Sequence, residues 1–108
     1  MKIVLTGAKG AGKSTVGRVL AEDLGLRLVE TDELIEAACA AESGQRRTCR
    51  EILRAEGEAA FRQHEAHAVA AAAEEDYCVV SVGGSTLLDP ESRRLLRRDS
   101  VMVYLRAD

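Results

Sequence analysis

The 108-residue sequence has little of what several functional classes require. Its three cysteines, Cys39, Cys49 and Cys78, are odd in number and follow no C-x-x-C or zinc-finger spacing. They therefore predict free, buried thiols, and neither a disulfide framework nor a metal cluster. Basic residues number 15 against 18 acidic ones, so the net charge is −3 and a nucleic-acid surface is not expected.

A long hydrophobic run is also missing. The longest apolar-looking stretch, 66–73, is rich in alanine and contains His67, so it is too short and too polar to cross a membrane. No secretion signal is visible, because the chain enters an apolar run almost at its first residue. With 46% hydrophobic and 31% charged residues and no repeats, the composition is typical of one soluble globular domain over 1–108, which we expect to be cytoplasmic.

One motif is present in full. Residues 7–14 match G-x-x-x-x-G-K-[ST], the pattern of a phosphate-binding loop. Its glycines let several backbone amides converge on one anion, and the helix that follows adds the positive end of its macrodipole. We predict that Lys13 reaches the β- and γ-phosphates of ATP and that the Ser14 hydroxyl ligates Mg²⁺. The predicted nucleotide-binding residues are Gly7, Gly10, Ala11, Gly12, Lys13, Ser14 and Thr15.

Strands and helices are predicted to alternate, which is typical of a parallel sheet with helices on both faces. The fold class is therefore α/β, a P-loop NTPase in which strand, loop and helix follow in the order that the motif needs. A glycine turn without a ligand is the less favoured alternative. The predicted strands are 2–6, 26–31, 78–82 and 101–105, and the predicted helices are 13–24, 32–41, 49 to the break at Gly57, 58–75, and one starting at 89.

The carboxyl ends of these strands are expected to form the site, because open α/β sheets bind ligands there. The phosphate loop, the strand end at 30–32 and the turn at 83–85 should converge on one crevice. Asp32 could accept a proton from a substrate hydroxyl, or could only stabilise the helix that it begins. Glu30 is a candidate Mg²⁺ ligand, and an exposed strand-end carboxylate is an equal alternative.

Substrate contacts are predicted from glycine and arginine. The adjacent glycines Gly83 and Gly84 would let backbone amides approach a phosphate or a substrate closely. Arg62, beside the core residue Phe61, is our candidate for pairing a substrate anion. The denser basic cluster at 46–50 is interpreted as a solvated loop.

Taken together, these segments resemble the shikimate kinase family. The resemblance implies a fold like that of the nucleoside monophosphate kinases and transfer of the ATP γ-phosphate to the 3-hydroxyl of shikimate, in aromatic amino acid biosynthesis. Magnesium is the expected cofactor, and ATP and a small hydroxylated acid are the expected partners. The segments that carry the resemblance are 7–17, 30–32, 57–62, 82–85 and 103–105, in order and at nearly the family's spacing.

The resemblance also implies roles for single residues. In the family, the acid matching Asp32 binds substrate hydroxyls and is the candidate base, and the arginine matching Arg62 pairs the substrate carboxylate. The glycines at 83–84 match glycines that contact substrate and γ-phosphate. We predict Lys13 and Asp32 as catalytic residues, Ser14 and Glu30 as metal ligands, and Asp32, Arg62, Gly83, Gly84 and Ser85 as substrate-binding residues.

Three features depart from the family pattern. Glu30 stands where the family usually has aspartate, Ser85 stands where it usually has a third glycine, and 37–47 is several residues longer. Family members also continue into a lid carrying an arginine and an adenine-contacting loop, which these 108 residues do not include. We therefore expect a fragment or a shortened protein.

Three hypotheses remain. The first is a shikimate-type kinase, monomeric if complete. The second is a kinase for another polyol or a nucleotide acceptor. The third is a lid-less nucleotide-binding remnant without turnover.

Overall fold

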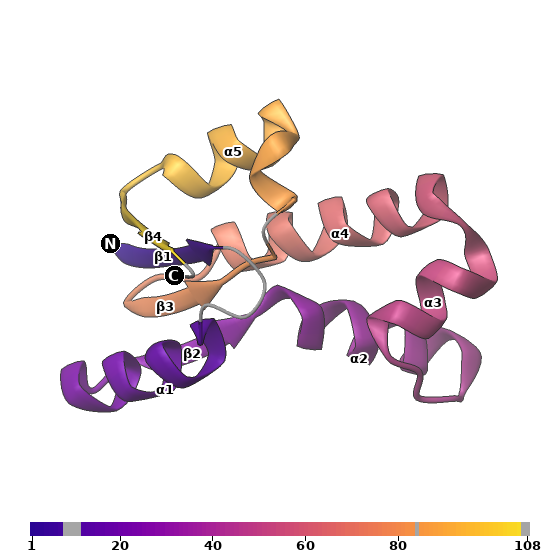
Figure 1. The fold of residues 1–108 in the computed structure, drawn as a ribbon, viewed down its shortest axis with the longest axis horizontal. Helices are drawn as coiled ribbons and strands as arrows, with labels where there is room; N and C mark the ends of the chain where they lie inside the picture. The colour runs from indigo at the N-terminus through magenta and orange to yellow at the C-terminus, as the bar shows by residue number, and fades with distance from the viewer. Residues whose placement is uncertain (8–11, 84, 107–108) are drawn as a thin grey trace.

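A computed structural model describes residues 1–7, 12–83 and 85–106. Within these ranges, four strands form one parallel sheet in the order β2-β3-β1-β4 (Figure 1). The strands are β1 (Lys2–Gly7), β2 (Arg27–Glu30), β3 (Cys78–Ser81) and β4 (Ser100–Leu105). The helices are α1 (Lys13–Leu24), α2 (Thr31–Ser43), α3 (Cys49–Glu56), α4 (Glu58–Ala73) and α5 (Pro90–Arg97), with a 3₁₀ turn, η1 (Thr86–Leu88).

The predicted layering is confirmed, because helices pack on both faces of the sheet (Figure 1). On one face, α1 lies so close that a Cβ atom built on Gly17 would come within 3.3 Å of Leu28 and 3.4 Å of Leu5. On the other face, α4 and α5 bury Val69 and Leu96 in one cluster with side chains of the central strands. Burial of such apolar side chains stabilises the fold by about 1.5–3 kcal/mol each.

The junction of β2 and α2 differs from the prediction. We expected a strand to Thr31 and a helix from Asp32, but α2 already begins at Thr31. Thr31 is buried, and its hydroxyl donates to the Ser81 carbonyl of β3 at 3.4 Å. The helix therefore starts directly at the sheet edge, which places Glu30 and Asp32 side by side at the strand ends.

The helices α2, α3 and α4 form a helical lobe beside the sheet (Figure 1). The predicted capping box starts α3: the Glu51 amide donates to the Thr48 hydroxyl at 3.2 Å, and the Thr48 amide donates to the Glu51 carboxylate at 2.9 Å. A second, smaller core holds the lobe together. Its buried members are Ile35, Cys39, Ile52 and Ala68.

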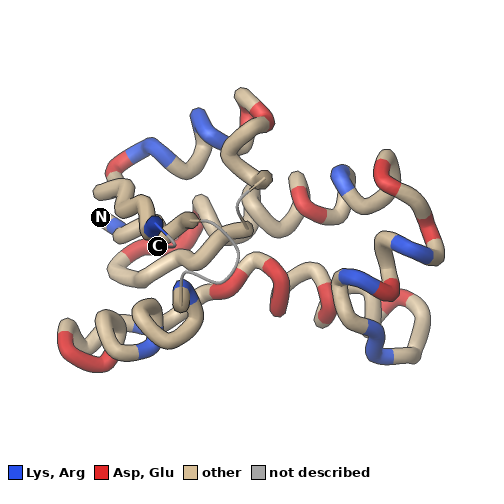
Figure 2. Tube along the Cα trace, viewed as in Figure 1, with Lys and Arg blue, Asp and Glu red and all other residues tan. Residues whose placement is uncertain are grey.

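The basic segment is a loop in which Arg46 is exposed, as interpreted, and it also makes ion pairs that were not predicted. Arg46 pairs with Glu33 at 2.9 Å and with Glu36 at 3.5 Å, and Arg47 pairs with Glu56 at 3.0 Å. Figure 2 shows the basic loop lying between the acidic residues of α2 and α3. These pairs tie the loop to both helices, so the segment closes the outer end of the lobe.

The structure also bears on the expected burial of the cysteines and on the expected lack of a membrane-spanning segment. Cys39 and Cys78 are buried as predicted, but Cys49 is only partly buried, because it begins α3 at the edge of the lobe. In the described ranges, no helix combines the length and the apolar character that crossing a bilayer requires.

Candidate functional site

The carboxyl ends of the strands border a cavity of about 100 Å³. It receives side chains from the start of α1, from the junction of β2 and α2, and from the end of β3. The predicted convergence of three distant segments is therefore confirmed for the residues that the structure describes. The lining residues are Lys13, Ser14, Glu30, Asp32, Ser81, Val82 and Gly83.

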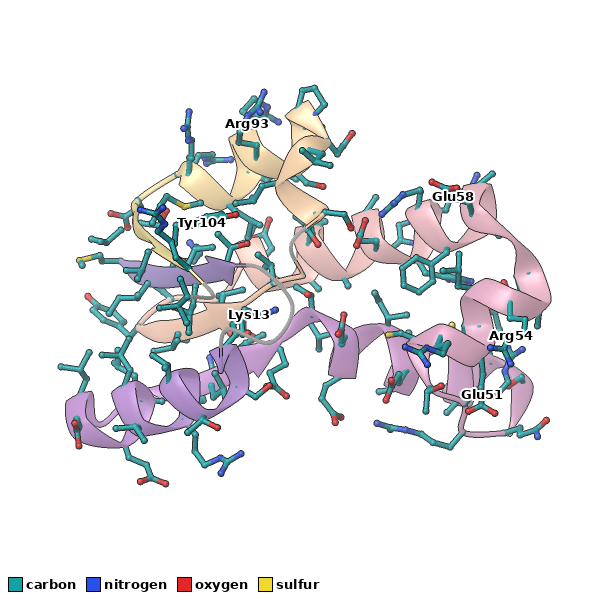
Figure 3. The ribbon with its side chains drawn as sticks, viewed as in Figure 1. Lys13, Glu51, Arg54, Glu58, Arg93 and Tyr104 are labelled. Atoms are coloured by element: carbon teal, nitrogen blue, oxygen red, sulfur yellow. The ribbon has the colours of Figure 1, made fainter. Side chains whose placement is uncertain are left out.

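The N-terminus of α1 is built to face an anion. Gly12 precedes the helix in the left-handed conformation, with φ of 75°, which glycine adopts without steric cost. Within the described residues, no side chain caps this helix end, and its first turn holds no acidic residue. Its amide groups and its positive dipole end are thus left for a ligand. Lys13 projects from this point (Figure 3). Gly10 and Ala11, also predicted to bind nucleotide, lie outside the described residues.

Gly7 and Thr15 occupy the two sides of the loop. Thr15 is exposed on α1. Gly7 ends β1 and is buried, and a Cβ atom at this position would lie 2.5 Å from the Leu105 carbonyl oxygen of β4. Glycine is therefore required there by the packing of two strands, whatever further contact it makes with a nucleotide.

Asp32 lies between charges of opposite sign. Desolvation raises the pKa of its carboxyl, and the nearby Glu36 and Glu65 carboxylates raise it further. The Lys13 ammonium and a hydrogen bond from Cys49 oppose that rise in pKa. The net result is a carboxylate that binds a proton more readily than an ordinary aspartate.

Arg62 is the centre of a polar network on α4. Its Nη1 donates to Glu65 Oε1 at 2.9 Å and to Ser85 Oγ at 3.3 Å, and its Nη2 donates to Glu58 Oε1 at 3.5 Å. The second oxygen of Glu65 accepts from the Thr86 hydroxyl at 3.1 Å. The Glu65 hydrogen bond is the main reason that the pKa of Arg62 is raised, so the guanidinium is firmly cationic.

The Arg62 network is connected to the cavity by the turn after β3. The Thr86 amide donates to the Gly83 carbonyl at 3.1 Å, and Gly83 lines the cavity. The negative charge of Glu65 also raises the pKa of Asp32. The Arg62 network and the cavity are therefore neighbours. Gly84 lies outside the described residues, so its predicted contact stays a prediction.

Sequence reasoning missed Glu65 and Thr86. Both are buried, with 9% and 1% of their surfaces exposed, and each satisfies the other. The available signal was spacing: Glu65 follows Arg62 by three residues, so the two share one face of a helix. Such a pair usually lies on a solvated surface, which is why its spacing alone did not single it out.

The oxygen donors at the cavity suit a magnesium ion carried by phosphates. Ser14 supplies a hydroxyl, and Glu30 and Asp32 supply carboxylates. Among the residues with described positions, no group of three or more His, Cys, Asp or Glu could hold a metal ion alone. Magnesium at phosphate sites needs only one or two protein ligands beside phosphate and water, so the donor set fits it.

A parallel sheet whose first strand leads through a glycine-rich loop into an uncapped helix defines a P-loop protein of the α/β class. The family model for shikimate kinase matches residues 9–108, so the chain belongs to the shikimate kinase family. The resemblance recognised in the sequence is thereby confirmed.

Single relatives agree with the family model. The shikimate kinase of Symbiobacterium thermophilum is 46% identical over 108 residues, which is 100% of this chain and 59% of the relative. That of Geobacter metallireducens is 43% identical over 105 residues, 97% of this chain and 55% of the relative. The chain thus spans little more than half the length of these curated relatives.

Solved structures give the same result for the fold. The shikimate kinase of Acinetobacter baumannii, solved in complex with shikimate, superposes with a TM-score of 0.85 at 33% identity, over 99% of this chain and 56% of the other. That of Bacteroides thetaiotaomicron superposes with a TM-score of 0.85 at 30% identity, over 97% of this chain and 56% of the other. The predicted P-loop fold is confirmed.

Proposed function

We propose that this chain carries the phosphate-donor site and the acid-binding site of an ATP-dependent kinase that phosphorylates the 3-hydroxyl of shikimate. One observation supports this most. Asp32, whose carboxyl has a raised pKa, lines one cavity with Lys13 and Ser14. Glu65, the ion-pair partner of Arg62, is one of the carboxylates that raise this pKa. In this proposal Asp32 is the base, the start of α1 faces the nucleotide phosphates, and Arg62 is the cation for the substrate carboxylate.

The nucleotide phosphates would lie against the N-terminus of α1. The first amides and the dipole of this helix would hold the anion, and the Lys13 ammonium would add a mobile positive charge. The Ser14 hydroxyl would ligate Mg²⁺ directly, and Glu30 would do so directly or through water. When bound, the ion neutralises charge on the phosphate oxygens.

Asp32 would accept the proton of the attacking hydroxyl. The bond from that oxygen to the γ-phosphorus forms as the bond to the β-γ bridging oxygen breaks, and ADP leaves. Phosphoryl transfer asks mainly for alignment and charge stabilisation, so a general base here contributes less than positioning does. The pKa of its carboxyl, which burial raises and Lys13 lowers, is shifted in the direction that favours accepting a proton.

Arg62 would bind the carboxylate of the acid substrate. A planar guanidinium can offer two parallel N–H groups to a carboxylate, which fixes the orientation of a small ring as well as its position. A carboxylate at a fixed distance from the attacking hydroxyl would distinguish shikimate from a nucleotide or a simple polyol. We further infer a cytoplasmic monomer that binds neither nucleic acid nor membrane, in keeping with its surplus of acidic residues.

The proposal is tested with protein expressed together with whichever residues follow Asp108 in the reading frame. ADP release should depend on shikimate, and Arg62→Ala should reduce kcat/KM for shikimate by about 100-fold, as expected when a charged contact to substrate is lost. Arg93→Ala is the matched control, because Arg93 is an exposed arginine on α5 (Figure 3) whose guanidinium donates to the Leu87 carbonyl at 3.5 Å.

The competing hypotheses predict different results. Turnover with a nucleotide or another polyol, and none with shikimate, would sink the proposed substrate. Nucleotide binding without turnover on any acceptor would leave the remnant hypothesis standing in its place.

A further inference from the structure

The Arg62 guanidinium is held at one of its two terminal nitrogens. An Nη group carries two hydrogens, and those of Nη1 are directed to Glu65 Oε1 at 2.9 Å and to Ser85 Oγ at 3.3 Å. The two acceptors come from different elements, α4 and the turn after β3. Both donor positions of Nη1 are therefore used within the protein.

The opposite edge of the guanidinium is left for a ligand. Within the described ranges, Nε has no hydrogen-bond partner, and the acceptor facing Nη2 is Glu58 Oε1 at 3.5 Å. The Glu58 side chain is 77% exposed at the outer end of α4 (Figure 3), so it can leave at little cost. Nε and Nη2 form the edge whose two N–H groups are parallel, which is the arrangement that matches a carboxylate.

A single bond from Glu65 would leave the guanidinium plane able to turn about it. A second acceptor on the same nitrogen, supplied by another element, removes that freedom. We propose that Ser85 is a positioning residue, which holds the Arg62 plane so that the Nε and Nη2 edge meets the carboxylate of an acidic substrate. That carboxylate displaces Glu58. The inference rests on the proposed function, in which Arg62 binds the substrate carboxylate.

Three variants of the chain separate this role from a structural one. Ser85→Ala removes the acceptor and should weaken shikimate binding, measured by calorimetry, by about three- to tenfold. Ser85→Thr keeps the hydroxyl and should restore most of the affinity. Glu58→Gln removes the competing carboxylate and should leave shikimate binding unchanged or tighten it by up to about fivefold.

The ligand-free protein provides a second readout. In nitrogen-15 NMR spectra, the Nη1 protons of Arg62 should give separate, slowly exchanging signals in the wild type and in Ser85→Thr. In Ser85→Ala they should broaden and average with those of Nη2. The thermal unfolding midpoint should be the same for all the Ser85 variants, because Ser85 is exposed.

The outcomes are distinguishable. Unchanged Arg62 signals in Ser85→Ala, together with unchanged shikimate affinity, would overturn the role of Ser85. If the wild type binds no shikimate while Ser85→Ala still frees the guanidinium, the positioning role stands and the proposed substrate fails.

Discussion

Replacing Glu65 by glutamine is expected to lower the free energy of unfolding by about 1–2 kcal/mol. Each carboxylate oxygen of Glu65 accepts one hydrogen bond, from Arg62 at 2.9 Å and from the Thr86 hydroxyl at 3.1 Å. Glutamine has nearly the same shape but only one oxygen, so it can satisfy one donor and turns its amide towards the other.

The magnitude follows from which donor loses its partner. The Arg62 side chain is 45% exposed, so water replaces much of what it loses. Thr86 is 1% exposed, and an unpaired buried hydroxyl costs about 1–3 kcal/mol. Because glutamine keeps a bond to one of the two donors, the expected loss lies in the lower part of that range.

The assay is urea unfolding followed by far-UV circular dichroism, with Glu58→Gln as the matched control. Glu58 lies on the same helix and contacts the same arginine, but it is 77% exposed, and its variant should stay within about 0.5 kcal/mol of the wild type. Equal stability of Glu65→Gln and Glu58→Gln would refute the reasoning, because burial would then make no difference to the carboxylate.

Two further predictions concern the cavity. Lys13→Ala should remove most of the affinity for Mg²⁺-ATP in calorimetry and leave the unfolding midpoint unchanged, and loss of folded protein would instead show a structural lysine. Asp32→Asn should gain stability relative to the wild type as pH rises from the ordinary 3.8 through the raised folded pKa, because the folded state disfavours the ionised carboxyl and asparagine avoids that cost. Urea unfolding between pH 3.5 and pH 7 measures the difference in stability between Asp32→Asn and the wild type. Apart from a constant offset, this difference should be about zero at the acid end and should grow in favour of Asp32→Asn as pH rises. Growth in favour of the wild type would contradict the raised pKa.

Much of the fold could be predicted because its signals are local. The phosphate loop marks the junction of β1 and α1, and the spacing of Thr48 and Glu51 marks the start of α3. The start of α2 was misplaced because a distant group decides it: the Thr31 hydroxyl reaches the Ser81 carbonyl on β3. The ion pairs of the basic loop could not be predicted for the same reason, since Arg46 finds its partners on α2.

The residues of the candidate site divide in the same way, into those with a local signal in the sequence and those that depend on a distant contact. Asp32 and Arg62 could be proposed from the sequence because a strand end and a family motif mark them. Glu65 and Thr86 were missed because neither has a reason to be buried until α4 packs beside the turn after β3. A candidate ligand-binding residue can thus be proposed from its own motif, whereas a residue that holds another in place is visible only once two segments meet.

The charges around Asp32 bear on the proposed reaction. In the ligand-free protein, burial, Glu36 and Glu65 raise the pKa of Asp32, and Lys13 lowers it. In the proposed complex, nucleotide phosphates would draw the Lys13 charge and add negative charge, which raises this pKa, whereas the accompanying Mg²⁺ would lower it. Because these bound groups act in opposite directions, the proposed base would contribute through its alignment with the attacking hydroxyl more than through a change in its proton affinity.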